Sequence, residues 1–175
     1  VDDLLYVDTY PPPDAKTPIR RRERQCGGLT ATALVAAARL GSRCAYAGLL
    51  GNDELSQFVE ERLRHEGIGL THAVRRDEAC PAHSFIVVDM SRQTRNIFFE
   101  LAGAVGAALD LPTEEAIRST KVLYVDHYGM EGILRAARIA RAAGIPVVAD
   151  IERDESPLFP ELLGSCDHLI VSHDF

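Results

Sequence analysis

Several features that would point to a membrane, a nucleic acid or an export pathway are missing from these 175 residues. No apolar run approaches about 20 residues, so no segment is long enough to cross a bilayer as a helix. The formal net charge of −7 and the pI near 5.3 argue against general binding to nucleic acids or anionic membranes. No basic start followed by an apolar stretch is visible, so the sequence shows no secretory signal.

Cysteine pairs with the spacing of metal or redox sites are also missing. The four cysteines lie far apart, at Cys26, Cys44, Cys80 and Cys166, with no C-x-x-C motif and no paired histidine spacing that would suggest zinc. We therefore predict no metal site in this chain. Free thiols are typical of a reducing compartment, so we expect a cytoplasmic protein.

What the sequence does contain is an alternation of short apolar strands with helical patterns. Asp53 is placed to cap a helix that ends at Gly67, Thr113 to cap another, and Gly144 to end the helix 129–143. Strands separated by helices of 10 to 15 residues indicate parallel pairing with right-handed crossovers. The predicted fold class is α/β: a three-layer αβα sandwich with a mainly parallel, Rossmann-like sheet.

Two segments interrupt this pattern. Ile19 to Gln25 is typical of an exposed, arginine-rich strand, and 84–99 contains two β-rich runs joined by a polar turn, which predicts a hairpin. We expect them to form a small β lid from segments of about 8–25 and 83–101. The arginines at 20, 21, 22 and 24 allow two interpretations: a strand edge protected by charge, or a surface that holds an anionic sugar derivative.

The most informative stretch runs from Cys26 to Asp53. Gly27 and Gly28 let a ligand approach the backbone closely, and the helix after them offers free N–H groups at its start. We expect that helix, 34–40, to be packed on most sides because its residues are small and apolar, and 44–47 to form a buried strand. Ligands of open α/β sheets bind beyond the carboxyl ends of strands, which selects the 27–32 turn and Asp126, although capping alone would also explain polar residues there.

The same stretch resembles the first signature of the ribokinase-like (PfkB) carbohydrate kinases. The similarity rests on the glycine pair, a polar residue at position 32, the segment Ala38-Arg39-Leu40-Gly41 and the later Gly48-x-x-Gly51-x-Asp53. It continues in order along the whole chain, from the opening Asp2-Asp3-Leu4 through the lid end at Ala102-Gly103-Ala104 to a later strand end at Val171-Ser172-His173-Asp174. Within the family, the pattern resembles that of ketohexokinases and sulfofructose kinases.

The resemblance implies ATP-dependent phosphorylation of a sugar hydroxyl, with Mg²⁺ as counterion and a homodimer through the β lid as a possible assembly. It assigns acceptor-binding roles to residues of the first strand, the glycine turn and two later loops, namely Asp2, Gly27, Gly28, Thr32, Gly103 and Asp126. An ionised carboxylate such as that of Asp2 can accept hydrogen bonds from two adjacent hydroxyls.

The sequence also departs from the family pattern. Thr32 stands where the family usually has Asn, and the second signature, a Gly-Ala-Gly-Asp turn with the catalytic Asp, has no counterpart. We therefore expect 1–175 to be an incomplete ribokinase-like domain whose ATP-binding half and catalytic residue lie beyond Phe175, and we expect it to be inactive alone.

Other functions remain open. A non-catalytic sugar-binding or regulatory module would use the same acceptor residues, and a nucleoside kinase would belong to the same superfamily. A dinucleotide-dependent dehydrogenase would need G-x-G-x-x-G after its first strand, where this chain has prolines instead.

Overall fold

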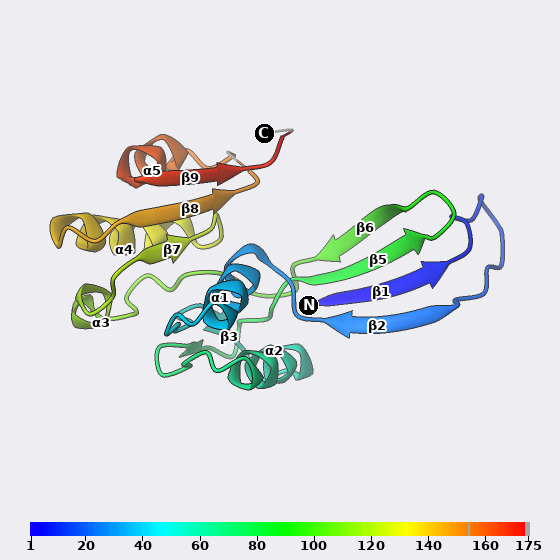
Figure 1. Ribbon diagram of the computed structural model, residues 1–175, viewed down its shortest axis with the longest axis horizontal. Coiled ribbons are helices and arrows are strands. Elements are labelled where there is room, and N and C mark those ends of the chain that lie inside the picture. The colour runs from blue at the N-terminus through cyan, green and yellow to red at the C-terminus, as the bar shows by residue number, and fades with distance from the viewer. Residues whose placement is uncertain (154, 174–175) are drawn as a thin grey trace.

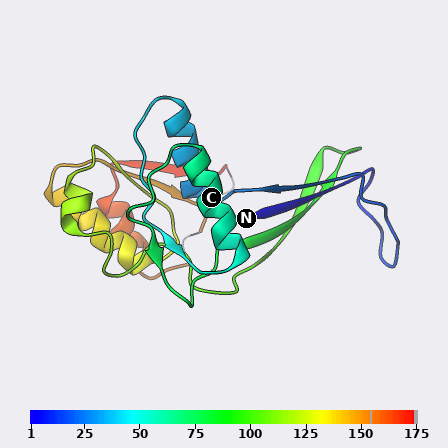
Figure 2. The same ribbon diagram turned by 90° about the horizontal axis from the view of Figure 1, so that it is seen from below.

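The computed structural model describes residues 1–153 and 155–173. Figure 1 shows two parts: a four-stranded sheet on the right, which we call the lid, and an α/β body on the left. Figure 2 shows that the lid projects from the body as a thin blade. The N-terminus lies where the two parts meet.

The lid sheet has the strand order β2-β1-β5-β6. Its strands are β1 (Asp2–Val7), β2 (Arg21–Gln25), β5 (His83–Asp89) and β6 (Thr94–Glu100). β5 and β6 pair antiparallel, which confirms the predicted hairpin outside the parallel sheet of the body. β1 pairs with β5 in parallel and with β2 antiparallel, so the sheet begins at residue 2 rather than at residue 8 as expected.

The larger part of the body is a parallel sheet covered by helices. Its strands pair in the order β7 (Leu123–Val125), β8 (Val147–Ile151) and β9 (His168–Val171). The helices α3 (Glu114–Arg118), α4 (Met130–Ala142) and α5 (Phe159–Ser165) pack on it. Val147, Ala149 and Ile151 are completely buried, whereas Val148 and Asp150 on the opposite face of β8 are only half-buried.

A second core joins α1 (Leu29–Arg39), α2 (Glu54–His65) and the short parallel pair β3 (Leu49–Leu50) and β4 (Val74–Arg75). Leu50, Val59 and Leu63 are its buried centre, and half-buried Leu34 and Val35 of α1 pack against them.

Two expectations for this region are wrong. α1 begins at Leu29 instead of residue 34 and contains no fully buried residue, because it packs on α2 along one side and exposes Thr32, Ala36 and Arg39 on the other. Residues 44–47 form no buried strand. Ala45 makes a single bridge to Gly69, and the regular strand comes later, at β3.

The helix boundaries follow the signals in the sequence. The Asp53 carboxylate accepts a hydrogen bond from Ser56 N at 2.9 Å, and Thr113 Oγ1 accepts one from Ala116 N at 3.2 Å, as N-caps do. Gly67 and Gly144, which follow α2 and α4, have positive φ of 74° and 70°. No helix in the described ranges combines the length and apolar character that a membrane span needs.

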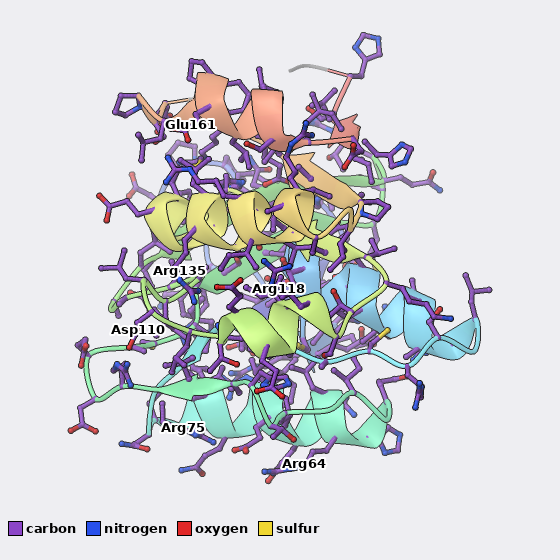
Figure 3. The ribbon with its side chains drawn as sticks, turned by 90° about the vertical axis from the view of Figure 1, so that its left-hand side faces the viewer. Arg64, Arg75, Asp110, Arg118, Arg135 and Glu161 are labelled. Carbon is purple, nitrogen blue, oxygen red and sulfur yellow. The ribbon has the colours of Figure 1, made fainter. Side chains whose placement is uncertain are left out.

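The end of the body that faces away from the lid is covered with paired charges (Figure 3). Arg118 donates to Glu114 at 2.7 Å, Arg75 and Arg64 both contact Glu60, and Arg135 donates to the Pro112 carbonyl at 3.0 Å. Exposed pairs of this kind contribute little stability individually. The other two side chains labelled in Figure 3 are also paired, because Asp110 lies 3.7 Å from Arg76 and Glu161 contacts Arg138.

Candidate functional site

The candidate site lies at the base of the lid, where β1 starts beside the turn that leads into α1. A Cβ atom added to Gly27 would lie only 2.1 Å from Asp2 Oδ2, so a larger residue at position 27 would displace the Asp2 carboxylate from its present orientation. That carboxylate makes no hydrogen bond or ion pair with any residue in the described ranges. A half-buried carboxylate without a protein donor can accept hydrogen bonds from a ligand.

The start of α1 is the second part of the site. Gly28 is its N-cap, with a positive φ of 86° that favours glycine, and no side chain in the part of the chain that the structure describes caps the helix. The first N–H groups of α1 are thus available to an acceptor. Thr32 N donates to Gly28 O at 3.1 Å, so exposed Thr32 lies one turn above Gly28 on the same side of the helix.

Asp126, directly after β7, is held against α1 by a residue that the sequence analysis missed. Thr30 Oγ1 donates to Asp126 Oδ2 at 2.6 Å, and Tyr128 N donates to Asp126 Oδ1 at 2.9 Å. Each oxygen keeps further acceptor capacity. The structure therefore brings Asp126 to the α1 side of the site, and Thr30 connects two segments that are 96 residues apart.

Two tyrosines complete this side of the site. Burial, reinforced by the negative charge of Asp126, raises the pKa of Tyr46 well above its usual range. Burial also raises the pKa of Tyr128, which the positive charge of Arg153 lowers in part. Both phenols are therefore neutral hydrogen-bonding groups at physiological pH. Tyr128 follows β7 closely, where the rule for strand ends already directs attention, whereas Tyr46 belongs to no recognisable motif and was missed by the sequence analysis.

Gly103 and Asp53 have clear structural roles. A Cβ on Gly103 would lie 2.5 Å from Glu78 O, and the neighbouring Ala104 exchanges backbone hydrogen bonds with Glu78 and Cys80. Gly103 thus permits a close crossing of two chain segments. The atoms nearest to its Cβ position belong to residues 78 and 80, not to Asp2. Asp53 is confirmed as a helix cap.

The arginine cluster formed by β2 and the residue before it contacts acidic side chains. Arg20 donates to Asp8 at 2.6 Å, and Arg21 lies 3.3 Å from Glu23 while its guanidinium covers the Tyr6 ring. Arg24 donates to Asp3 through two nitrogens. These pairs favour a charge-protected strand over a surface that binds an anionic sugar.

Cysteines and metals play no identified part in the site. Cys26 adjoins Gly27, and burial raises the pKa of its thiol, so it is a poor nucleophile. All four cysteines are free. Within 1–153 and 155–173, no group of three or more His, Cys, Asp or Glu side chains is arranged to hold a metal ion, so we assign no Mg²⁺ ligand here.

Comparison with known proteins identifies the class. The model of the pfkB family of carbohydrate kinases matches residues 3–174, so the chain belongs to this family. It is 24% identical over 98% of its length to a nucleoside kinase from Methanothermobacter thermautotrophicus, and 26% identical over 84% to a ribokinase from Haemophilus influenzae. It covers 57% and 49% of these relatives, and thus about half of their length.

Solved structures agree on the fold. Arabidopsis thaliana ribokinase complexed with ribose and ATP superposes with a TM-score of 0.81 at 19% identity, over 97% of this chain and 56% of that one. Thermotoga maritima ribokinase gives 0.77 at 22% identity, over 99% and 56%. The fold is therefore the ribokinase-like α/β fold, as predicted.

Proposed function

We propose that this chain forms the acceptor-binding part of an ATP-dependent sugar kinase. The observation that carries the proposal is the Asp2 carboxylate, which has no donor among the described residues and lies against Gly27 at the open start of α1. Membership of a carbohydrate kinase family supplies the reaction class, transfer of the γ-phosphoryl group of ATP to a hydroxyl. Such catalysis depends mainly on positioning and on stabilisation of charge.

Each acceptor residue has a distinct task in this proposal. Asp2 accepts hydrogen bonds from two adjacent sugar hydroxyls, Gly27 and Gly28 let the sugar approach the backbone, and the hydroxyl of Thr32 donates or accepts one bond. Asp126 lies at the margin, oriented by Thr30, and Gly103 fixes the end of the lid hairpin.

ATP and Mg²⁺ enter the proposal through the family alone. The described residues contain no group arranged to hold a metal ion, and we assign neither the nucleotide nor the catalytic base to a residue of this chain. The activity is therefore proposed for the whole protein, with this chain holding the acceptor. The four free cysteines support a reducing, cytoplasmic location.

A nucleoside is the second candidate acceptor, because one relative is a nucleoside kinase. Its ribose hydroxyls would meet the same carboxylate. Phosphoryl transfer from ATP should be measured for ribose, fructose, sugar acids and nucleosides with the protein encoded by the whole gene. A phosphoryl-transfer rate that saturates with one of these compound classes would identify the class of the acceptor. Sugar binding without phosphoryl transfer to any of them would favour a non-catalytic binding module.

Substitution of Asp2 tests the site. Asp2→Ala removes two hydrogen bonds to an ionised oxygen, each contributing about 1.5–3 kcal/mol, so kcat/KM for the acceptor should fall roughly hundredfold to ten-thousandfold. The ATP KM should hardly change. Asp8→Ala is the matched control, because Asp8 is an exposed carboxylate near the far end of β1 whose ion-pair partner among the described residues is Arg20. Acceptor kinetics within twofold of wild type for Asp2→Ala would show that the site is elsewhere.

A homodimer through the lid is the proposed assembly. β6 is an edge strand, and Ile97, Phe98 and Phe99 are 50%, 54% and 50% exposed in it. An apolar strand edge tends to be covered by another chain. Sedimentation should show a dimer for wild type and a monomer for Phe98→Glu, and a wild-type monomer at high concentration would contradict this assembly.

A further inference from the structure

Two neighbouring aspartates at the base of the lid have opposite surroundings. Successive residues of a strand point to opposite faces, so the pairing register places Asp2 in line with Gln25, Ser84 and Phe99 on one face of the lid. Asp3 lies in line with Arg24 and Phe85 on the other face. The Asp2 carboxylate has no protein donor in the described ranges, whereas the Asp3 side chain is only 2% exposed and accepts hydrogen bonds through both of its oxygens.

Arg24 is the principal partner of Asp3. Its Nε donates to Asp3 Oδ1 at 2.9 Å and its Nη2 to Oδ2 at 2.8 Å, a bidentate arrangement that fixes both the distance and the angle between the side chains. His83 Nε2 lies 2.9 Å from Asp3 Oδ2 and anchors the same carboxylate to β5. Asp3 thus connects the first three strands of the lid at their base.

The same guanidinium also reaches the body. Arg24 Nη1 donates to Glu54 Oε1 at 2.8 Å, and Glu54 is the first residue of α2. In Figure 1, β2 leads from the lid toward α1 and α2 at this point. One side chain therefore joins the start of β1 to a helix of the body.

We infer that Arg24 is a positioning residue for the acceptor site: it holds Asp3 and Glu54 together and so fixes the base of β1, from which Asp2 faces Gly27. The inference rests on the proposed function for its consequence, the orientation of the acceptor carboxylate. A buried ion pair is weak evidence for stability, since apolar residues of equal volume often stabilise as well. Apolar packing would not supply the directional hydrogen bonds of the Arg24–Asp3 pair, which fix the angle between the two side chains.

Three variants of the protein encoded by the whole gene test this role. Arg24→Met removes both contacts, Arg24→Lys keeps the charge but cannot hold two carboxylates in a fork, and Glu54→Gln removes only the charge on the body side. Glu54 is 84% exposed, so its variant should fold normally. Glu66→Gln is the matched control, because Glu66 follows α2 and pairs with Arg39 of α1, entirely within the body.

We expect the acceptor KM to rise at least tenfold in Arg24→Met, about threefold in Glu54→Gln, and to an intermediate extent in Arg24→Lys. The ATP KM should stay unchanged, and Glu66→Gln should match wild type in both constants. Amide hydrogen exchange gives a readout that needs no activity: Arg24→Met should speed exchange in β1 relative to β8.

The outcomes separate the two proposals. A lower Tm in Arg24→Met, with acceptor kinetics within twofold of wild type and unchanged exchange in β1, would overturn the positioning role. A wild-type protein that phosphorylates no acceptor would overturn the proposed function instead. Faster exchange in β1 of Arg24→Met would then still support Arg24 as the residue that orders the base of the lid.

Discussion

In the body, β8 buries Val147, Ala149 and Ile151 completely beneath the helices, whereas in the lid all seven residues of β6 are exposed. The two parts are therefore stabilised differently. The body depends on burial of apolar surface, which gains about 25 cal/mol per Å². The lid depends on strand pairing and on charged contacts at its base, such as those of Asp3 and Arg24.

This difference fits the roles that we propose for the rigid body and the movable lid. A close-packed body holds the ends of β7 and β8 rigidly, and a lid with little core of its own can change its angle to the body at small cost. The acceptor residues lie where the two parts meet: Asp2 belongs to the lid, while Gly28 and Asp126 belong to the body. A change in lid angle would therefore change the distance between groups that must act together.

The largest expected effect on stability comes from shortening an isoleucine in the body sheet, and the same change in the lid sheet serves as the comparison. Ile151 in β8 is 0% exposed, and Ile97 in β6 is 50% exposed. Ile151→Ala should lower the free energy of unfolding by about 2–5 kcal/mol, because a cavity replaces buried methyl groups. Ile97→Ala should cost less than about 1 kcal/mol.

Urea unfolding of the two isoleucine variants measures this contrast. Equal losses would show that the lid surface is buried in solution. If the loss for Ile97→Ala depends on protein concentration, the burial comes from an assembly through the lid.

The next effect concerns the charged base of the lid. Hydrogen bonds from the Arg24 guanidinium, and to a lesser extent from His83, hold the pKa of the Asp3 carboxyl well below its ordinary value of 3.8. The unfolded chain then binds more protons than the folded one below about pH 5, so the contribution of Asp3 to stability is present at neutral pH and is lost as the pH falls. Asp3→Asn should cost about 1.5–3 kcal/mol at pH 7.

The gap in stability between wild type and Asp3→Asn should narrow progressively as the pH falls from 5 toward 3. Urea midpoints at a series of pH values measure it. Some acid sensitivity should remain in the variant, since hydrogen bonds from Tyr10 N and Ser91 lower the pKa of Asp89 to about 2. A gap that stays constant from pH 7 to pH 3 would contradict the role of the Asp3 charge.

Local signals in the sequence predicted the parts of the fold that depend on neighbouring residues. The caps at Asp53 and Thr113 and the hairpin of β5 and β6 follow from residue types within a few positions of each other. The extent of packing around α1 did not follow, because it depends on which segments reach each side of the helix. A run of small apolar residues shows that a helix can be buried, not that it is.

The candidate site shows the same limit. The resemblance and the strand-end rule select Asp2, Gly27 and Asp126, and the structure places Asp2 against Gly27 and Asp126 beside α1. The contacts of Thr30 with Asp126 and of His83 with Asp3 join residues 96 and 80 positions apart. No spacing rule predicts such pairs, because they arise only when separate segments fold together.

The smallest expected change in stability belongs to Gly27→Ala, at the junction of lid and body. Gly27 is not among the glycines with positive φ, and the three atoms nearest to the new methyl group all belong to the Asp2 carboxyl group, which can rotate away. Stability should therefore change by less than about 1 kcal/mol, with a gain possible because alanine restricts the unfolded chain. The acceptor KM should nevertheless rise about tenfold or more, because the displaced carboxylate loses a charge-assisted hydrogen bond to the acceptor.

Gly164→Ala is the matched control for this last variant. Gly164 lies in α5 with open space around its Cβ position, so alanine should stabilise the helix slightly and leave the acceptor KM unchanged. Thermal melts and acceptor kinetics of the two variants separate the effects. An unchanged acceptor KM in Gly27→Ala would mean that the Asp2 carboxylate does not contact the acceptor, whereas a large loss of stability would mean that the turn before α1 is as tightly packed as the core of the body.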